Sequence, residues 1–387
     1  MSLSPPPGAD ARAVSDRLLE KITQASRRQG GCLPFDSYMN MALYEPGLGY
    51  YAGGLVPFGE QGDFVTAPES GALFGRCLAR SIASVLQQVS GGCVLELGAG
   101  SGALARVLLQ ELEALQALPE RYLILERSAA MRALQQDSLT GLPGLAARVE
   151  WLDRLPETAF NGVVFGNEVA DALPVSCFRW RDGQVQALGV SATEQGLAWC
   201  EMHPDDDLQR VVQGLARDNH WQGEYASEYC PGLKPWVQSL CALIASGAVL
   251  LADYGYGRTE YYHSQRCMGT LLCHYRHQAH SDPLWCPGLQ DITAFVDFTA
   301  VAEAGTDAGM RLAGYTSQAQ FLLACGLDQL LSAADPADTR RFLQLSNEAK
   351  RLVLPGEMGE RFKFIGFSRQ LERGVLGFAL PDLRSRL

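Results

Sequence analysis

Several features that would assign this chain to a protein class at once are missing from its sequence. Its 387 residues contain no apolar run long enough to cross a bilayer, and 32 Lys and Arg stand against 43 Asp and Glu, a formal net charge of −11. We therefore expect no membrane span and, because a basic surplus is lacking, no nucleic-acid partner. The first residues also lack the charged region and apolar core of a signal peptide. We expect a cytoplasmic protein.

The cysteines and histidines show no spacing typical of a disulfide framework or a metal site. The eleven cysteines are scattered, odd in number and never spaced as C-x-x-C, which predicts reduced thiols. Four of the six histidines and three cysteines gather within residues 263–286, but no pair there has the spacing usual for structural zinc. We therefore expect no bound metal.

The sequence does contain a regular alternation of strand and helix patterns. Hydrophobic residues make up 47% of the chain, a globular composition. Short apolar runs that predict strands occur at 93–97, 122–125, 148–151, 162–165 and 247–252. Because segments of helical spacing separate most of these runs, we expect an α/β fold with a mostly parallel sheet and helices on both faces.

The remaining segments predict an N-terminal extension and two insertions. Residues 1–70 read as a helix over 10–28 followed by a Gly-, Tyr- and Pro-rich lid segment. Residues 71–387 form the expected core, with insertions at about 176–246 and 254–290. The first insertion holds a predicted hairpin and two helices, and we expect the insertions to consist of helices and hairpins. Later segments predict helices over 292–304 and 317–325, an extended stretch over 310–315 and a last strand over 361–368.

The most specific local pattern is Glu96-Leu-Gly98-Ala-Gly100-Ser-Gly102, directly after a strand and at the start of a helix. Glycines at these positions let the backbone turn tightly and approach a ligand closely. The next predicted strand ends in Glu126, 24 residues after Gly102. A carboxylate there can accept hydrogen bonds from both ribose hydroxyls of a nucleoside.

Two cofactors compete for such a turn. A dinucleotide would place its pyrophosphate at the helix N-terminus, whereas S-adenosylmethionine would place its amino acid group there. Glu96 favours the second, because a carboxylate would repel a pyrophosphate but can interact with an ammonium. The pattern E-x-G-x-G-x-G also resembles motif I of class I methyltransferases. In that superfamily the position of Asp153 often contacts adenine, although a solvated loop aspartate is an alternative.

Several further blocks extend this resemblance over nearly the whole chain, which is similar to the MidA-like methyltransferase family. That family includes the mitochondrial complex I assembly factor that acts as a protein arginine methyltransferase. The matching blocks lie at residues 44–51, 62–70, 95–102, 167–175, 251–255, 269–271, 287–293, 296–298 and 358–362.

The resemblance implies a class I methyltransferase core with inserted helices and an S-adenosylmethionine cofactor. It also implies protein arginine methylation, with a protein partner that presents an arginine. The mitochondrial member symmetrically dimethylates an arginine of a complex I subunit. We read this chain as bacterial, and whether it shares that substrate is left open. A homodimer is also left open.

The predicted catalytic residues follow the fourth strand. Asn167 and Glu168 would lie at the carboxyl edge of the sheet, beside the cofactor, with Asn167 as a cofactor contact and Asp171 three residues on. A carboxylate can hold the planar guanidinium of arginine bidentately, and a second one can neutralise its other side. We therefore predict Glu168 as the principal catalytic residue and Asp171 as its support. The alternative is an acid pair at a helix start.

Other polar residues are candidates for the lid and the substrate groove. Asp63, Phe64 and Thr66 would belong to a lid over the cofactor, although residues 66–69 also fit a capping box that opens the next helix. Asp253 and Tyr254 follow the fifth strand and face the same edge. Asp291 and Asp297 could extend an acidic groove or cap helices.

Two functions from other classes stay open at this point. One is an NAD-binding oxidoreductase on the same core, against which Glu96 argues. The other is a non-catalytic assembly factor that keeps an S-adenosylmethionine pocket, since the same motifs would serve binding alone.

Overall fold

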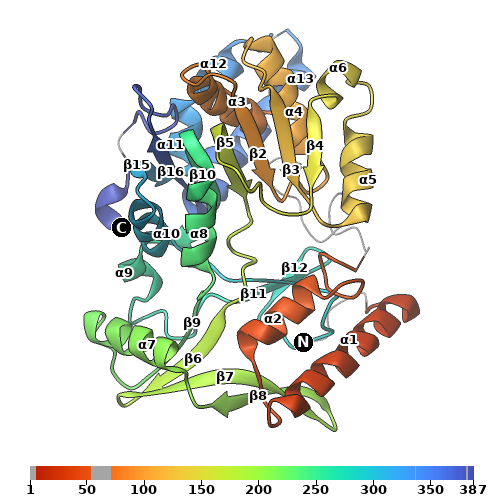
Figure 1. The fold of residues 1–387 in the computed structure, drawn as a ribbon, viewed down its shortest axis with the longest axis vertical. Helices are drawn as coiled ribbons and strands as arrows, with labels where there is room; N and C mark the ends of the chain where they lie inside the picture. The colour runs from red at the N-terminus through yellow and green to blue at the C-terminus, as the bar shows by residue number, and fades with distance from the viewer. Residues whose placement is uncertain (1–5, 54–70, 336, 381) are drawn as a thin grey trace. The chain divides into compact units, whose positions relative to one another are not determined.

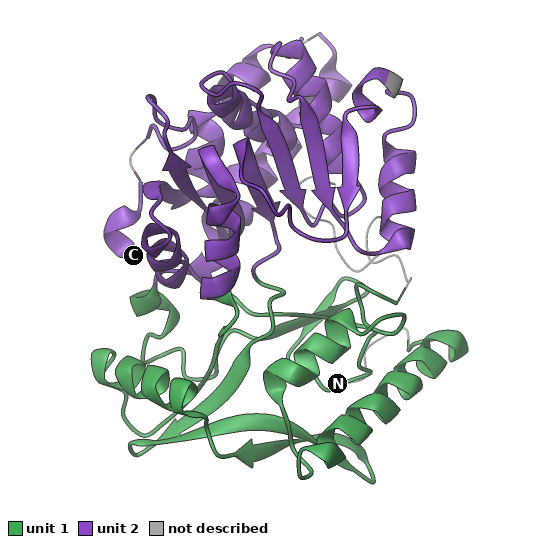
Figure 2. Cartoon of the chain, in the orientation of Figure 1, with its two compact units in different colours: residues 1–64, 171–233, 258–295 green, residues 65–170, 234–257, 296–387 purple. Residues whose placement is uncertain are grey.

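The computed structural model describes residues 6–53, 71–335, 337–380 and 382–387. The chain divides into two compact units, coloured separately in Figure 2. Unit 1 comprises residues 1–64, 171–233 and 258–295, and unit 2 comprises residues 65–170, 234–257 and 296–387. The N-terminal segment and most of both insertions thus belong to one unit.

Unit 2 contains the predicted α/β core, built on an eight-stranded sheet. The order of seven strands is β15-β16-β10-β5-β2-β3-β4, and β14 pairs with β10. Strands β10, β5, β2, β3 and β4 are parallel, whereas β16 is antiparallel to both β10 and β15. The strands are β2 (Cys93–Leu97), β3 (Arg121–Leu125), β4 (Val149–Leu152), β5 (Phe160–Asn167), β10 (Ile244–Tyr256), β14 (Val296–Asp297), β15 (Arg311–Ser317) and β16 (Phe362–Arg369).

The central strands of unit 2 are buried on both faces because helices cover the sheet (Figure 1). Phe165 of β5, Leu250 of β10 and Phe364 of β16 belong to one core cluster with residues of the helices. The α/β prediction is therefore confirmed. The helices are α3 (Leu73–Leu86), α4 (Ala103–Ala114), α5 (Ala129–Ser138), α6 (Pro143–Ala146), α8 (Leu233–Ala242), α10 (Phe298–Asp307), α11 (Gln318–Ala324), α12 (Leu327–Ser332), α13 (Thr339–Val353) and α14 (Met358–Arg361), with a short 3-10 helix at Arg384–Arg386.

Unit 1 is built on two antiparallel sheets. The larger has the order β1-β7-β6-β9 with β8 beside β7, and the smaller has the order β12-β11-β13. Its strands are β1 (Leu33–Pro34), β6 (Ser176–Arg181), β7 (Gln184–Thr193), β8 (Gly196–Met202), β9 (Glu224–Tyr229), β11 (Leu272–Tyr275), β12 (Gln278–His280) and β13 (Asp291–Thr293). Its helices are α1 (Ala9–Arg28), α2 (Phe35–Tyr44), α7 (Asp206–Asp218) and α9 (Arg258–Tyr261).

The first insertion contains the predicted hairpin, in β6, β7 and β8, and the two predicted helices, α7 and α8, whereas the second insertion consists of the short helix α9 and the strands β11 and β12. The predicted helix over 292–304 is divided: its first residues belong to β13 and β14, and α10 starts at Phe298. Asp297 sets that start, since its Oδ1 accepts hydrogen bonds from the backbone N–H of Thr299 and Ala300 at 3.0 and 3.1 Å. Helices α2 and α13 were not predicted.

The predicted capping box at residues 66–69 lies outside the described residues, and helix α3 starts at Leu73. Ala72 is the N-cap and makes no side-chain cap. Instead, the backbone N–H of Leu73 donates to Glu348 Oε1 of α13 at 2.6 Å. A carboxylate that is distant in sequence therefore binds the N-terminus of α3, which no local pattern indicates.

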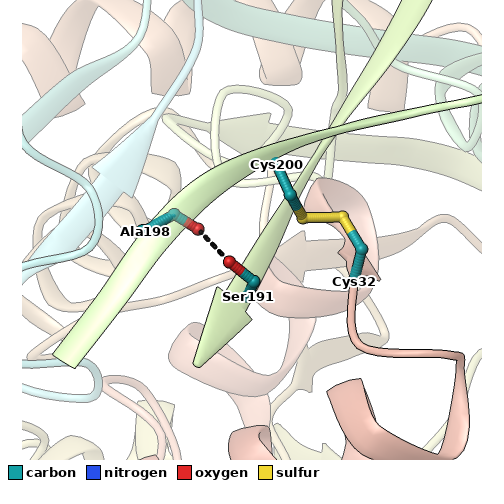
Figure 3. The surroundings of a disulfide bond; sticks show 4 residues. All are labelled: Cys32, Ser191, Ala198 and Cys200. Atoms are coloured by element: carbon teal, nitrogen blue, oxygen red, sulfur yellow. Dashed lines mark hydrogen bonds between the residues drawn. A yellow bond between two sulfur atoms is a disulfide. The ribbon is translucent and has the colours of Figure 1, made fainter. Parts of the chain in front are cut away.

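The prediction of reduced thiols is wrong for one pair, because Cys32 and Cys200 form a disulfide (Figure 3). It joins the end of the α1–β1 connection to β8, close to a hydrogen bond of 3.3 Å from Ser191 Oγ to Ala198 O. Most other described cysteines are buried free thiols. Burial raises the pKa of Cys77 to about 12 and that of Cys241 to about 11.

The described residues contain neither a metal-binding cluster nor a membrane-spanning helix. No group of three or more His, Cys, Asp or Glu side chains among them is arranged to hold a metal ion. No helix that they form is both long and apolar enough to cross a membrane.

Candidate active site

The glycine turn lies between β2 and α4 as predicted. Gly98, Gly100 and Gly102 have φ values of +63°, +51° and +82°, a region that side chains disfavour. Gly102 is the N-cap of α4 and has no side chain to occupy the helix N-terminus. A Cβ on it would also lie 3.0 Å from the Cα of Gln135. The glycine pattern thus keeps the turn tight and lets α5 pack closely against it.

Glu126 follows β3 directly and is tied to the glycine turn. Its Oε1 accepts a hydrogen bond from the backbone N–H of Ser128 at 2.8 Å, and its Oε2 accepts one from Gln135 Nε2 at 3.2 Å. The same Nε2 donates to Gly100 O at 3.0 Å. Since Leu97 and Leu125 are register partners, the ends of β2 and β3 lie side by side. Gln135 was missed, because its partners come from parts of the chain that only the fold brings together.

Glu96 is part of β2, and its side chain is buried rather than exposed to solvent. Its side chain is only 1% exposed, and Tyr122 OH of β3 donates to its Oε2 at 2.6 Å. Burial raises the pKa of Glu96 to about 7, although the hydrogen bond from Tyr122 opposes the shift. Its contact with a methionyl ammonium stays a prediction. An ammonium bound there would have to hold the carboxylate ionised.

Asp153 follows β4 and pairs with Arg132 of α5. Arg132 NH2 donates to Asp153 Oδ1 at 2.5 Å, and its guanidinium also donates to the backbone oxygen of Glu126. The Asp153 side chain is 79% exposed, so the ion pair adds little stability. It does hold the ends of β3 and β4 near each other, where the resemblance implies an adenine contact.

The end of β5 carries a backbone feature that the sequence did not indicate. Glu168 has φ +54°, which is uncommon for a residue with a side chain. Its backbone N–H donates to Ala252 O at 2.9 Å, and Asn167 Nδ2 donates to its Oε1 at 3.0 Å. The amide oxygen of Asn167 is buried and has no hydrogen-bond partner among the described residues.

Asp253 holds this conformation in place. Its Oδ2 accepts hydrogen bonds from the backbone N–H of Val169 and Ala170 at 3.2 and 2.9 Å, and its Oδ1 accepts one from Tyr254 N at 2.9 Å. Asp253 is almost fully buried. It therefore anchors the residues after Glu168, a positioning role that differs from the predicted substrate contact. The ring of Tyr254 packs edge-on against Phe362.

The glycine turn and the end of β5 touch each other. Leu97 and Gly166 are register partners, and a Cβ on Gly98 would lie 3.0 Å from Val169 Cγ2. The carboxyl ends of β2, β3 and β5 thus bring Gly98–Gly102, Glu126, Asn167 and Glu168 to one edge of the sheet. This is the edge at which parallel α/β sheets bind ligands.

The remaining predicted residues belong to unit 1 or lie outside the described residues. Asp291 is buried in β13, where Tyr51 OH donates to its Oδ1 at 2.8 Å, so it does not cap a helix. Tyr51 stacks on Tyr44, and burial raises the pKa of Tyr51, with Asp291 adding to the shift. Asp171 is also buried in unit 1. The lid residues Asp63, Phe64 and Thr66 lie outside the described residues.

These residues fit an S-adenosylmethionine cofactor better than a dinucleotide. Glu126 offers a carboxylate to ribose hydroxyls, and the bare helix start at Gly102 leaves backbone N–H groups for a carboxylate of the ligand. Asn167 adds an unused amide oxygen at the same edge. The carboxyl of Glu96, buried in β2 directly before the turn, favours a ligand with an ammonium over one with a pyrophosphate.

Comparisons with known proteins agree with this site. Residues 77–316 match the family model named "Putative S-adenosyl-L-methionine-dependent methyltransferase". The chain is 30% identical to "Protein arginine methyltransferase NDUFAF7, mitochondrial" of Danio rerio, over 86% of this chain and 83% of that protein. It is 28% identical to the Drosophila melanogaster homologue, over 93% and 87% of the two chains.

A solved structure resembles the whole chain. A protein of Burkholderia thailandensis, called a "likely methyl transferase" and bound to S-adenosyl-homocysteine, is 42% identical, with a TM-score of 0.95 and full coverage of both chains. Together these findings confirm the predicted fold, the methyltransferase activity and the S-adenosylmethionine cofactor.

Proposed function

The chain belongs to the S-adenosyl-L-methionine-dependent methyltransferase family, and from this premise we propose that it methylates an arginine side chain of a protein. The distant relatives named protein arginine methyltransferases support the choice of substrate. An oxidoreductase with a dinucleotide cofactor finds no support in any of the comparisons.

The observation that carries the proposal is the fixed carboxylate of Glu168 beside the glycine turn. The backbone of Glu168 is left-handed, and Asp253 holds it by accepting hydrogen bonds from the backbone N–H groups of the next two residues. Asn167 orients one oxygen of the Glu168 carboxylate. A side chain at an unfavourable φ costs about 1–3 kcal/mol and persists where the surroundings enforce it, often at functional sites. Glu168 therefore supplies a rigid negative charge at the carboxyl ends of β2, β3 and β5, which we call the cofactor edge.

Such a charge suits a guanidinium as the methyl acceptor. When bound, S-adenosylmethionine supplies an electrophilic methyl group on a cationic sulfur. A second cation that approaches it is repelled unless a carboxylate compensates the charge. Glu168 would bind the guanidinium through charged hydrogen bonds, orient one nitrogen toward the methyl group and attract the proton that this nitrogen loses.

The test is Glu168→Gln, which keeps the shape of the side chain and removes its charge. Loss of a charge-assisted pair at a desolvated site costs roughly 2–5 kcal/mol, so methyl transfer should fall roughly 30- to 4,000-fold. Cofactor affinity should stay within about threefold, because Glu168 faces the substrate. The measurement is transfer of a labelled methyl group to proteins of a lysate, followed by mass spectrometry of the labelled residue, with calorimetry for the cofactor.

Glu157→Gln is the matched control, since Glu157 is an exposed carboxylate of unit 2 that forms an ion pair with the exposed Arg154. It should transfer methyl groups at the wild-type rate. Wild-type transfer by Glu168→Gln would remove Glu168 from the mechanism. Label on a residue other than arginine would overturn the proposed substrate while leaving the methyltransferase activity intact. Absence of transfer by the wild-type protein would favour the assembly-factor alternative.

A further inference from the structure

The side chain of Gln135 links three parts of the cofactor edge. It is 0% exposed and extends from α5 toward the ends of three strands. Its Nε2 donates to Gly100 O in the glycine turn and to Glu126 Oε2 after β3, while its Oε1 accepts from Trp151 Nε1 of β4 at 2.9 Å. A side chain that contacts the turn, the carboxylate and the neighbouring strand at once is placed to fix their separation.

Trp151 determines which way the amide faces. An indole N–H can only donate, so the amide oxygen must face Trp151. The two N–H groups then face Gly100 and Glu126, which both offer only acceptors there. Both sides of the amide thus agree on one orientation, and a rotated amide would lose all three hydrogen bonds.

The contacts of Glu126 leave room for a ligand. A carboxylate has about four lone-pair sites, and the described residues use two of them, through Ser128 N and Gln135 Nε2. Gln135 and Ser128 hold one oxygen each. The carboxylate plane is therefore fixed before any ribose hydroxyl binds, and a ligand does not have to pay for its ordering.

We propose that Gln135 is a positioning residue for the cofactor, which aims the Glu126 carboxylate at the ribose hydroxyls and sets its distance from the glycine turn. Gln135 acts through Glu126 and does not touch the reacting atoms. The inference rests on the predicted ribose contact of Glu126, and it is independent of the arginine substrate.

The experiment compares two ligands by calorimetry on four proteins and one matched control. The ligands are S-adenosylhomocysteine and its 2′,3′-dideoxy analogue, which lacks the ribose hydroxyls. The proteins are the wild type, Gln135→Met, Glu126→Ala and the double variant. Gln135→Met keeps the length of the side chain and removes its hydrogen bonds. Gln136→Met is the matched control, because Gln136 is the next residue of α5 and is exposed.

Gln135→Met should bind S-adenosylhomocysteine roughly 10- to 100-fold more weakly, the range for loss of a hydrogen bond to a charged group. Its affinity for the dideoxy analogue should change less than about threefold. The double variant should bind S-adenosylhomocysteine within about threefold of Glu126→Ala, since the two residues act through one contact. Gln136→Met should match the wild type with both ligands.

Equal weakening with both ligands, or additive losses in the double variant, would show that Gln135 has a merely structural role. Unchanged affinity in Glu126→Ala would overturn both the ribose contact and this inference, without touching the proposed arginine substrate. If Gln135→Met fails to fold, Trp151→Phe tests the same point. It removes the donor that orients the amide, so it should weaken S-adenosylhomocysteine more than the dideoxy analogue.

Discussion

The sheet of unit 2 is mostly parallel and buried on both faces, whereas the two sheets of unit 1 are antiparallel and partly exposed. In β5 five consecutive residues are buried, while β8 contains no buried residue. Parallel strands bring their carboxyl ends to one edge, so backbone turns and short side-chain contacts build a ligand site there. Antiparallel strands offer no such edge, and unit 1 combines its own apolar core with hydrogen-bond networks between side chains.

The carboxylate of Glu228 is the centre of one such network in unit 1. Its Oε1 accepts hydrogen bonds from Tyr261 OH at 2.7 Å and from the Oγ1 and backbone N–H of Thr270 at 2.5 and 2.8 Å. Burial raises its pKa, although these bonds oppose the shift. The network ties residues 258–295 to β9. Close backbone approach between strands is one support of unit 2, and the Glu228 network is one support of unit 1.

The largest expected effect tests the dependence of unit 2 on close backbone approach. Gly162 of β5 has φ +139°, and a Cβ there would lie 1.9 Å from Cys93 O of β2. Neither backbone can give way, so Gly162→Ala should lower the free energy of unfolding by about 4 kcal/mol or more, or prevent folding. Urea unfolding of the wild type and the variant measures this difference in the free energy of unfolding.

Gly144→Ala is the control for this substitution, because nothing lies within 4 Å of a Cβ at Gly144. It should change the free energy of unfolding by less than about 0.5 kcal/mol. A midpoint of Gly162→Ala equal to that of the wild type would contradict the idea that the backbone contact limits this strand pair.

A somewhat smaller effect is expected from the disulfide of unit 1. Cys32 and Cys200 are separated by 168 residues, and closing a loop of that size should stabilise the protein by about 3–4 kcal/mol. Cys200→Ser should lose this amount, and a dithiol should destabilise the wild type but not the variant. Cys200 lines a cavity of about 310 Å³.

Cys267→Ser is the matched control, because Cys267 is an exposed free cysteine of unit 1. Cofactor affinity should stay unchanged in both variants, since the cofactor edge belongs to unit 2. Identical unfolding of Cys200→Ser and the oxidised wild type would show that the disulfide does not stabilise unit 1.

The third prediction concerns pH and a buried carboxyl of unit 2. Burial raises the pKa of Glu96 from 4.5 to about 7 in the folded protein, so folding favours the neutral form. The contribution of the Glu96 carboxyl to the free energy of unfolding is fully present below pH 4.5 and is lost as the pH rises through 7. The loss is about 3 kcal/mol, at 1.36 kcal/mol per pKa unit.

Glu96→Gln should remove that part of the pH dependence, because the amide stays neutral and its oxygen can still accept from Tyr122. Urea unfolding of both proteins from pH 4.5 to 8 measures it. Glu228 and Glu348 also have a raised pKa, so some loss with pH should persist in the variant. Parallel stability curves for the two proteins would show that Glu96 titrates normally.

The parts that the sequence predicted well are those whose causes are local. The run from Cys93 to Leu115 contains an apolar strand, the glycines that its turn requires and a helix with leucines on one side, so each signal lies within a few residues of its effect. The strand at 361–368 and the helix after Ser317 were predicted for the same reason. Ser317 caps that helix through its own hydroxyl.

The parts that were missed have causes that lie far apart in the sequence. Leu73 takes its cap from Glu348, Gln135 finds its partners on three other segments, and Cys32 pairs across 168 residues. The positive φ of Glu168 leaves no trace in local composition, because Asp253 enforces it from the next strand of the sheet. Such features need the fold before they can be recognised.

The position of β16 has a consequence for the synthesis of the chain. Among the described strands it is the last in sequence, yet it pairs with β10 from Tyr254↔Phe362 to Gly247↔Arg369 and separates β10 from β15. At ~5–20 residues per second, β10 waits roughly 5–20 s for this partner. During that time one edge of this largely buried strand keeps open N–H and C=O groups, which allow pairing with other chains. Nascent chains that stop before Phe362 should therefore aggregate or require a chaperone.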